Sequence, residues 1–141
     1  MKPPEEAKRD LVGQWVAKAE EDFLAADTLI ASGAECADVI AFLSQQAAEK
    51  LLKAYLTWLQ IDFPRTHDIG RLLDILAGAD ADTAERLANA DALSDYGVEI
   101  RYPGELPVLT IDAAKQAFAL ALQVRAAILA LLPGEPGDAR R

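Results

Sequence analysis

Apolar and polar positions recur with a helical period through most of the chain, most clearly from Ala41 to Trp58, a stretch without Gly or Pro. At about 100° per residue, one broad face of this stretch is apolar. Its members are Ile40, Leu43, Ala47, Leu51, Ala54, Tyr55 and Trp58. We predict a helix from Cys36 to Leu59, wide enough in its apolar face to contact several partner helices. This helix is expected to lie at the centre of an all-helical bundle.

A row of polar residues follows another face of the same helix. Gln45, Glu49 and Lys53 are spaced at i, i+4 and i+8. Glu49 precedes Lys53 by one helical turn, the favourable order for an ion pair that contributes about 0.2–0.5 kcal/mol. We interpret the row as a solvated face, or as a set of partners for the loop that carries Arg101. The functional alternative is that the row lines a polar cleft.

The same periodicity predicts further helices, separated by Gly- and Pro-containing breaks. They cover residues 10–32, 67–77, about 82–96 and 111–132. Thr66 and Thr110 are the expected N-caps of the second and fourth of these, and Asp82 and Glu85 have capping-box spacing at the start of the third. A short link at Gly33 makes the first two helices antiparallel neighbours. We therefore predict an all-α, up-and-down bundle of four or five helices over residues 10–132. Residues 1–9 are expected to form a flexible leader and residues 133–141 a flexible tail.

Composition narrows the class of protein. The chain has 141 residues, 52% of them hydrophobic, which fits one globular domain. The net charge of −9 argues against a broad nucleic-acid surface. The single Cys, Cys36, excludes an intrachain disulfide, and no Cys or His cluster suggests a metal or another cofactor. No apolar run approaches the roughly 18 residues of a membrane span, so we expect a cytoplasmic protein without a membrane partner. Apolar residues on several faces of the central helix favour a homodimer.

Three stretches, QQAAEKLLKAYL, PRTHDIGRLL and DYGVEIRYPGE, together resemble the HEPN domain family of the small prokaryotic type over about residues 10–132. The resemblance implies a helical bundle, frequent dimers, nucleotide binding, and in many members a minimal nucleotidyltransferase as partner. Many members are metal-independent ribonucleases with an Arg-x4-6-His motif. The only His here is His67, and none follows Arg101, so this motif is absent.

The resemblance therefore implies a nucleotide-associated binding module or an accessory subunit of a minimal nucleotidyltransferase, with no catalysis expected of the chain alone. One alternative is a metal-independent ribonuclease toxin of a toxin–antitoxin pair that acts on RNA. Another is a purely structural dimeric scaffold.

Arg101 and Tyr102 are the first candidates for ligand binding, because Arg holds phosphate with two hydrogen bonds and Tyr stacks on a base. Tyr96 is placed to share their pocket. The alternative for Arg101 is structural: it neutralises a helix C-terminus or pairs with a carboxylate such as Glu49 or Asp95. His67 is a candidate phosphate or base contact near the central helix. Its alternative is a helix-start residue whose ring packs and bonds locally.

Overall fold

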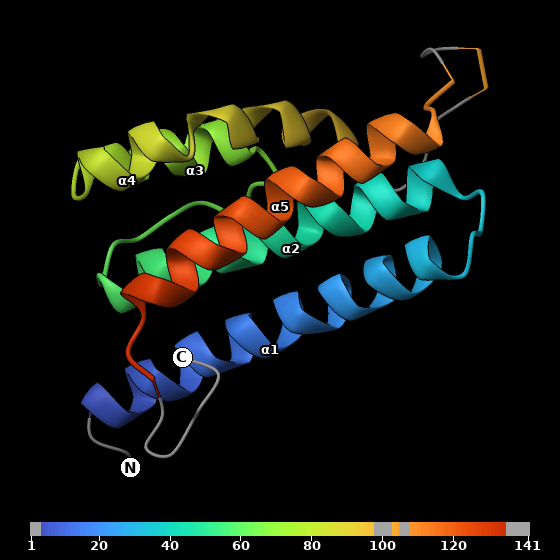
Figure 1. Ribbon diagram of the computed structural model, residues 1–141. Coiled ribbons are helices and arrows are strands. Elements are labelled where there is room, and N and C mark those ends of the chain that lie inside the picture. Colours follow the sequence, from blue (N-terminus) through green and yellow to red (C-terminus); the bar gives the residue numbers. More distant parts are fainter. Residues whose placement is uncertain (1–3, 98–102, 105–107, 135–141) are drawn as a thin grey trace.

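The computed structural model describes residues 4–97, 103–104 and 108–134 of the chain. Within these ranges the chain forms five α-helices and one 3-10 helix, and no strand (Figure 1). The helices are α1 (Pro4–Ala31), α2 (Ala37–Trp58), α3 (Ile69–Ala77), α4 (Ala81–Arg86), the 3-10 helix η1 (Ala88–Tyr96) and α5 (Ile111–Leu131). The predicted all-α bundle is confirmed.

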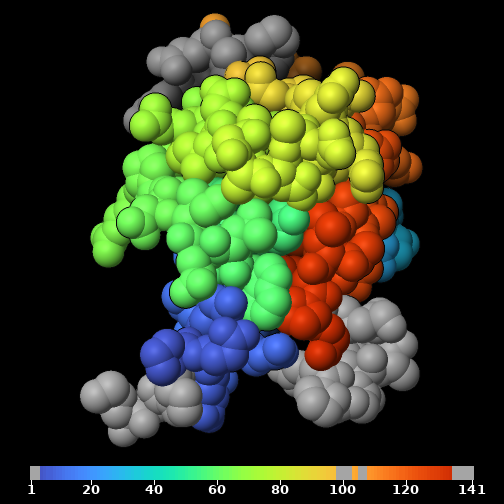
Figure 2. Space-filling model, turned by 90° about the vertical axis from the view of Figure 1, so that its left-hand side faces the viewer, coloured from blue at the N-terminus to red at the C-terminus, as the bar shows by residue number. Residues whose placement is uncertain are grey.

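The helices lie in three layers around α2. Helices α2 and α5 lie side by side in the middle, with α1 on one side and α3, α4 and η1 on the other (Figures 1 and 2). Every residue from Leu51 to Leu56 is buried, because neighbours surround α2 on all sides at that level. The prediction that this helix is the centre of the bundle is therefore correct.

Helix α1 begins at Pro4, earlier than the expected Asp10, so residues 4–9, which we assigned to the leader, are helical. Pro4 suits the first turn because its missing N–H has no helical partner there. Glu5 in the same turn favours the positive end of the helix dipole and lies 3.4 Å from Lys8. The Lys8 ammonium in turn lies 4.0 Å from the centre of the Trp58 ring, which ties the first turns to α2.

Two helix ends share one hydrogen-bond pattern, in which a residue of positive φ reverses the chain. After α1 this residue is Gly33, with φ of 75°, as its sequence position predicts. After α2 it is Gln60, with φ of 60°. There the N–H of Gln60 donates to the Thr57 carbonyl and the N–H of Ile61 to the Leu56 carbonyl. The chain therefore turns back along α2 instead of leading away from it.

The segment between α2 and α3 returns along α2 as far as Glu49, where it brings His67. The N-cap of α3 is Asp68, whose carboxylate accepts from the Arg71 N–H at 3.2 Å. The prediction of Thr66 as N-cap is wrong, because Thr66 lies two residues before the N-cap and its hydroxyl accepts from the N–H of Asp68 itself. Since the link doubles back, α3 then runs alongside α2 in the same direction.

Helix α4 begins two residues before the expected capping box. Its N-cap is Asp80, which accepts from the Thr83 N–H at 3.1 Å, so Asp82 lies inside the first turn. Asp80 also accepts from the Tyr55 hydroxyl at 2.6 Å, which fixes α4 against α2. Burial and the Asp80 carboxylate raise the pKa of Tyr55 to about 12. The predicted single helix is split at Leu87, after which η1 winds more tightly.

Helix α5 begins at the predicted N-cap Thr110, whose hydroxyl accepts from the Ala113 N–H at 3.0 Å. Its inner face is made of small and branched side chains: Ala114, Ala117, Ala121, Val124 and Ile128. Arg125 bonds Glu20 of α1 at 2.9 Å, which explains the Arg in an apolar stripe. By length and composition alone α5 would suffice to cross a membrane, contrary to the expectation that no stretch comes near that limit.

Candidate functional site

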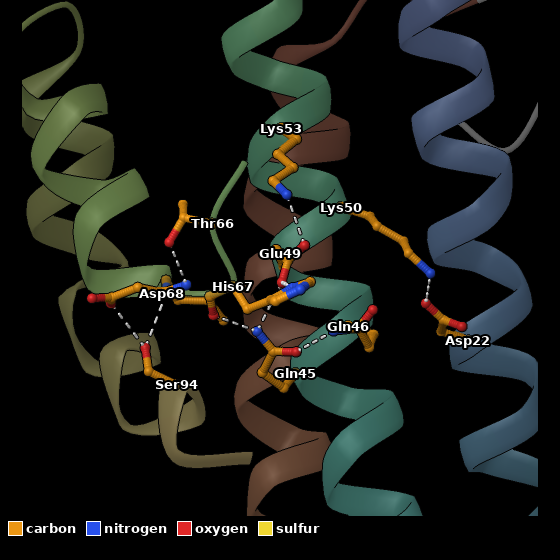
Figure 3. A network of polar contacts seen from close by, with 11 residues as sticks. Asp22, Gln45, Gln46, Glu49, Lys50, Lys53, Thr66, His67, Asp68 and Ser94 are labelled. Carbon is orange, nitrogen blue, oxygen red and sulfur yellow. Dashed lines mark hydrogen bonds and ion pairs between the residues drawn. The ribbon is translucent and has the colours of Figure 1, made fainter. Parts of the chain in front are cut away.

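The polar row of α2 is buried and bonded to itself. Gln45, Glu49 and Lys53 are 0%, 3% and 6% exposed. One Glu49 oxygen accepts from Lys53 Nζ at 2.8 Å, and the other accepts from Gln45 Nε2 at 3.1 Å (Figure 3). The interpretation as a solvated face is therefore wrong. The segment that returns from the end of α2 covers this face, which no helical periodicity reveals.

Lys53 lies in a partly aromatic setting. Its ammonium is 5.6 Å from the centre of the Trp15 ring on α1 and 5.9 Å from that of Phe63 in the returning segment. Both distances fall within the range of cation–π attraction. The two rings and the Glu49 carboxylate together replace the water that a buried ammonium loses. Lys53 thus neutralises Glu49 within the fold and is not a cation presented to solvent.

His67 is the exposed end of this network. Its Nδ1 lies 2.9 Å from a Glu49 oxygen, and its backbone carbonyl accepts from Gln45 Nε2 at 2.8 Å (Figure 3). The side chain is nevertheless 69% exposed. Both the side chain and the backbone of His67 are thus anchored to α2 while the far edge of the ring faces water. The interpretation of a purely local helix-start bond is wrong, because the partner lies 18 residues away in the chain.

The carboxyl of Glu49 stays ionised in this setting. Burial raises its pKa, but hydrogen bonds from Lys53, Gln45 and His67 and the charge of Lys53 outweigh burial, so the pKa of Glu49 lies below its ordinary value. A buried carboxylate therefore faces three donors. This arrangement fixes the geometry of the whole group, since each donor would lose its acceptor if Glu49 moved.

The end of η1 closes the site from a third direction. A Cβ on Gly97 would lie 3.2 Å from Gln45 Nε2 and 3.3 Å from the His67 carbonyl oxygen, which is tighter than ordinary packing. Glycine at this position lets η1 approach the Gln45 amide closely. Tyr96, the preceding residue, is partly buried and packs on the core. Arg101 and Tyr102 lie outside the described residues.

The structure thus brings together Gln45, Glu49, Lys53 and His67 from the predicted set. The sequence reading missed Gln46, which donates to Gln45 Oε1 at 2.7 Å, and the close approach of Gly97. The adjacency of Gln45 and Gln46 in the sequence is the one signal that could have indicated the role of Gln46. Within the described ranges, no group of three or more His, Cys, Asp or Glu side chains is arranged to hold a metal ion.

The described residues thus form an all-α bundle whose central helix carries a buried carboxylate–lysine pair bonded to one exposed imidazole. The HEPN domain profile matches residues 12–131, and the chain belongs to the HEPN domain family. It is similar to the crystal structure of TT1696 from Thermus thermophilus, with 28% identity over 86% of this chain and 98% of that one, and a TM-score of 0.69. ST0689, an archaeal HEPN homologue, shares the fold, with 24% identity over 85% of this chain and 96% of that one, and a TM-score of 0.64. The comparison with curated proteins gave no match.

Proposed function

We propose that this chain is a nucleotide-binding HEPN module that lacks the Arg-x4-6-His nuclease motif and serves as an accessory subunit of a minimal nucleotidyltransferase. The observation that carries the proposal is the exposed imidazole of His67, held by the buried carboxylate of Glu49. A side chain fixed at its base and open at its tip is suited to contact a ligand, because little conformational freedom is lost on binding.

Other groups that a nucleotide needs follow soon after Gly97 in the sequence. Gly97 lies against Gln45 and the His67 backbone, and the chain continues from it to Arg101 and Tyr102. Arg suits a phosphate and Tyr a base face, while His67 adds a hydrogen-bonding group. A few such residues are compatible with a net charge of −9, since a single nucleotide needs no extended basic surface.

Thermal unfolding with a panel of ribonucleotides tests the proposal. A ligand present at about 100 times its dissociation constant stabilises the folded state by about 2.7 kcal/mol. We expect such a shift for the wild type, its loss in His67→Ala and Arg101→Ala, and its retention in Lys18→Ala, which removes an exposed charge from α1.

The same melts separate a binding role of Arg101 from a structural one. If Arg101 binds a phosphate, Arg101→Ala leaves the melting temperature of the ligand-free protein nearly unchanged. A large loss without ligand, together with no nucleotide shift in the wild type, would support the structural dimeric scaffold instead.

The accessory-subunit part of the proposal is tested with a partner. A minimal nucleotidyltransferase encoded beside this chain would be co-expressed with it, and the mixture separated by size. Co-elution at a defined stoichiometry is expected, and separate elution of the two proteins at micromolar concentration would contradict it.

A ribonuclease toxin is the second candidate, and the same contact favours it. An imidazole oriented by a buried carboxylate is an arrangement used for acid–base catalysis. Incubation with total RNA in EDTA decides between the two functions. We expect no specific cleavage; cleavage that disappears in His67→Ala would instead establish the ribonuclease.

A further inference from the structure

The imidazole of His67 is bonded through one nitrogen. Nδ1 lies 2.9 Å from Glu49 Oε1, and no hydrogen bond from the described residues reaches Nε2. The Glu49 carboxyl also accepts from Lys53 at 2.8 Å and from Gln45 at 3.1 Å. These donors keep the carboxyl of Glu49 ionised, and an ionised carboxylate can only accept a hydrogen bond from the ring. The proton between Nδ1 and Glu49 must therefore belong to Nδ1.

The position of that proton decides the chemistry of the exposed edge. A neutral imidazole carries one proton, so a proton on Nδ1 leaves a lone pair on Nε2. A half-turn of the ring would place the carbon Cδ2 opposite Glu49 and break the bond of Nδ1, so that bond holds the ring in its present orientation. With a side chain 69% exposed, the acceptor nitrogen is open to a ligand.

We infer that His67 presents Nε2 as a hydrogen-bond acceptor, so that this site takes an O–H or N–H donor of its ligand and not a phosphate oxygen. In a nucleotide the donors are the sugar hydroxyls and the base N–H groups, whereas an ionised phosphate oxygen only accepts. The inference rests on the proposed function and specifies which part of the nucleotide lies against His67, namely the nucleoside.

The chain offers a direct test because it contains a single His. Protein made with 15N-labelled histidine gives imidazole signals that belong to His67 alone. At pH 8, before ligand is added, we expect Nδ1 to show the shift of a protonated ring nitrogen and Nε2 that of an unprotonated one. Glu49→Gln places an amide opposite Nδ1, which can donate to it, and should move the proton toward Nε2.

Ligand is then added as the four ribonucleoside monophosphates, their 2′,3′-dideoxy forms and inorganic phosphate. The Nε2 signal should move with a ribonucleotide and stay with inorganic phosphate. Loss of this response with the dideoxy form assigns the donor to the sugar, and its persistence assigns the donor to the base. His67→Asn keeps a donor for Glu49 but lacks Nε2. We expect this variant to bind ribonucleotide about tenfold more weakly, which corresponds to roughly 1.4 kcal/mol of binding free energy.

Three results would overturn the inference: a proton on Nε2 in the free protein, an equal response to inorganic phosphate, or nucleotide binding that leaves Nε2 unmoved. In the last case the proposed function survives and this inference alone fails. If no monophosphate binds, the proposed function and its ligand assignment fail together, while the spectrum of the free protein still decides the tautomer. Unchanged melting of His67→Asn checks that its fold is intact.

Discussion

Lys53→Met removes the cation from the buried pair while keeping most of the volume of the side chain. Among the described residues, Glu49, which is 3% exposed, then keeps Gln45 and His67 as donors. Breaking a buried ion pair by removing one partner costs about 3–5 kcal/mol, because the other charge is left uncompensated. Since two donors remain, we expect the lower end, about 3 kcal/mol at pH 7, measured by urea unfolding with circular dichroism.

The pH dependence of this loss identifies its cause. In the wild type the pKa of Glu49 is lower than in the unfolded chain, so its stabilisation is complete above the unfolded pKa and is lost as the pH falls through the folded one. Without Lys53, burial should raise the pKa of Glu49 above its unfolded value. The variant would then regain stability on protonation, and its deficit should shrink between pH 7 and pH 4.

Lys50→Met is the matched control, on the same helix and one turn earlier. Lys50 pairs with Asp22 at 2.6 Å, but the two side chains are 21% and 16% exposed. A pair that reaches water contributes about 1 kcal/mol or less. Equal losses in the two variants, or a deficit of Lys53→Met that stays constant down to pH 4, would refute the reasoning on Glu49.

Three further predictions concern other contacts. Tyr55→Phe should cost about 1 kcal/mol in urea unfolding, since Asp80 loses one of its donors; a neutral result would mean that water replaces the hydroxyl. Gln60→Gly should raise the free energy of unfolding by roughly 0.5–1 kcal/mol and Gly33→Ala should lower it by about as much, because both positions have positive φ; opposite signs would contradict the assigned turn. Light scattering at micromolar concentration should give the mass of a dimer, and a monomer mass would exclude the predicted homodimer.

The bundle was predictable because its helices follow from periodicity and strong stop signals. Gly33 ends α1 and Thr110 starts α5 as their residue types predict. The errors lie at positions where two polar residues compete for the cap. Asp68 and Asp80 lie within two residues of the chosen Thr66 and Asp82, and tertiary contacts select between such neighbours.

The candidate site was predictable as a set of residues but not as a geometry. Periodicity places Gln45, Glu49 and Lys53 in one row, and cannot tell whether water or another segment covers it. The covering segment exists because Gln60 adopts a positive φ, which is uncommon for a residue other than Gly. That single backbone angle turns the chain back along α2 and delivers His67 to Glu49.

Stability alone does not account for the polar row of α2. Replacing a buried ion pair by apolar residues of similar volume is often neutral or stabilising, so the fold does not require Glu49 and Lys53 at its centre. The pair does what apolar side chains cannot do, because a carboxylate forms a directional hydrogen bond. Glu49 holds the ring of His67 by such a bond, and Lys53 and Gln45 hold Glu49 in place. An exposed side chain that only filled surface area would need no such support. We therefore interpret the buried network as the support that orients one solvent-facing imidazole. In every variant of this site, the orientation of the His67 ring and the stability of the fold must accordingly be measured separately.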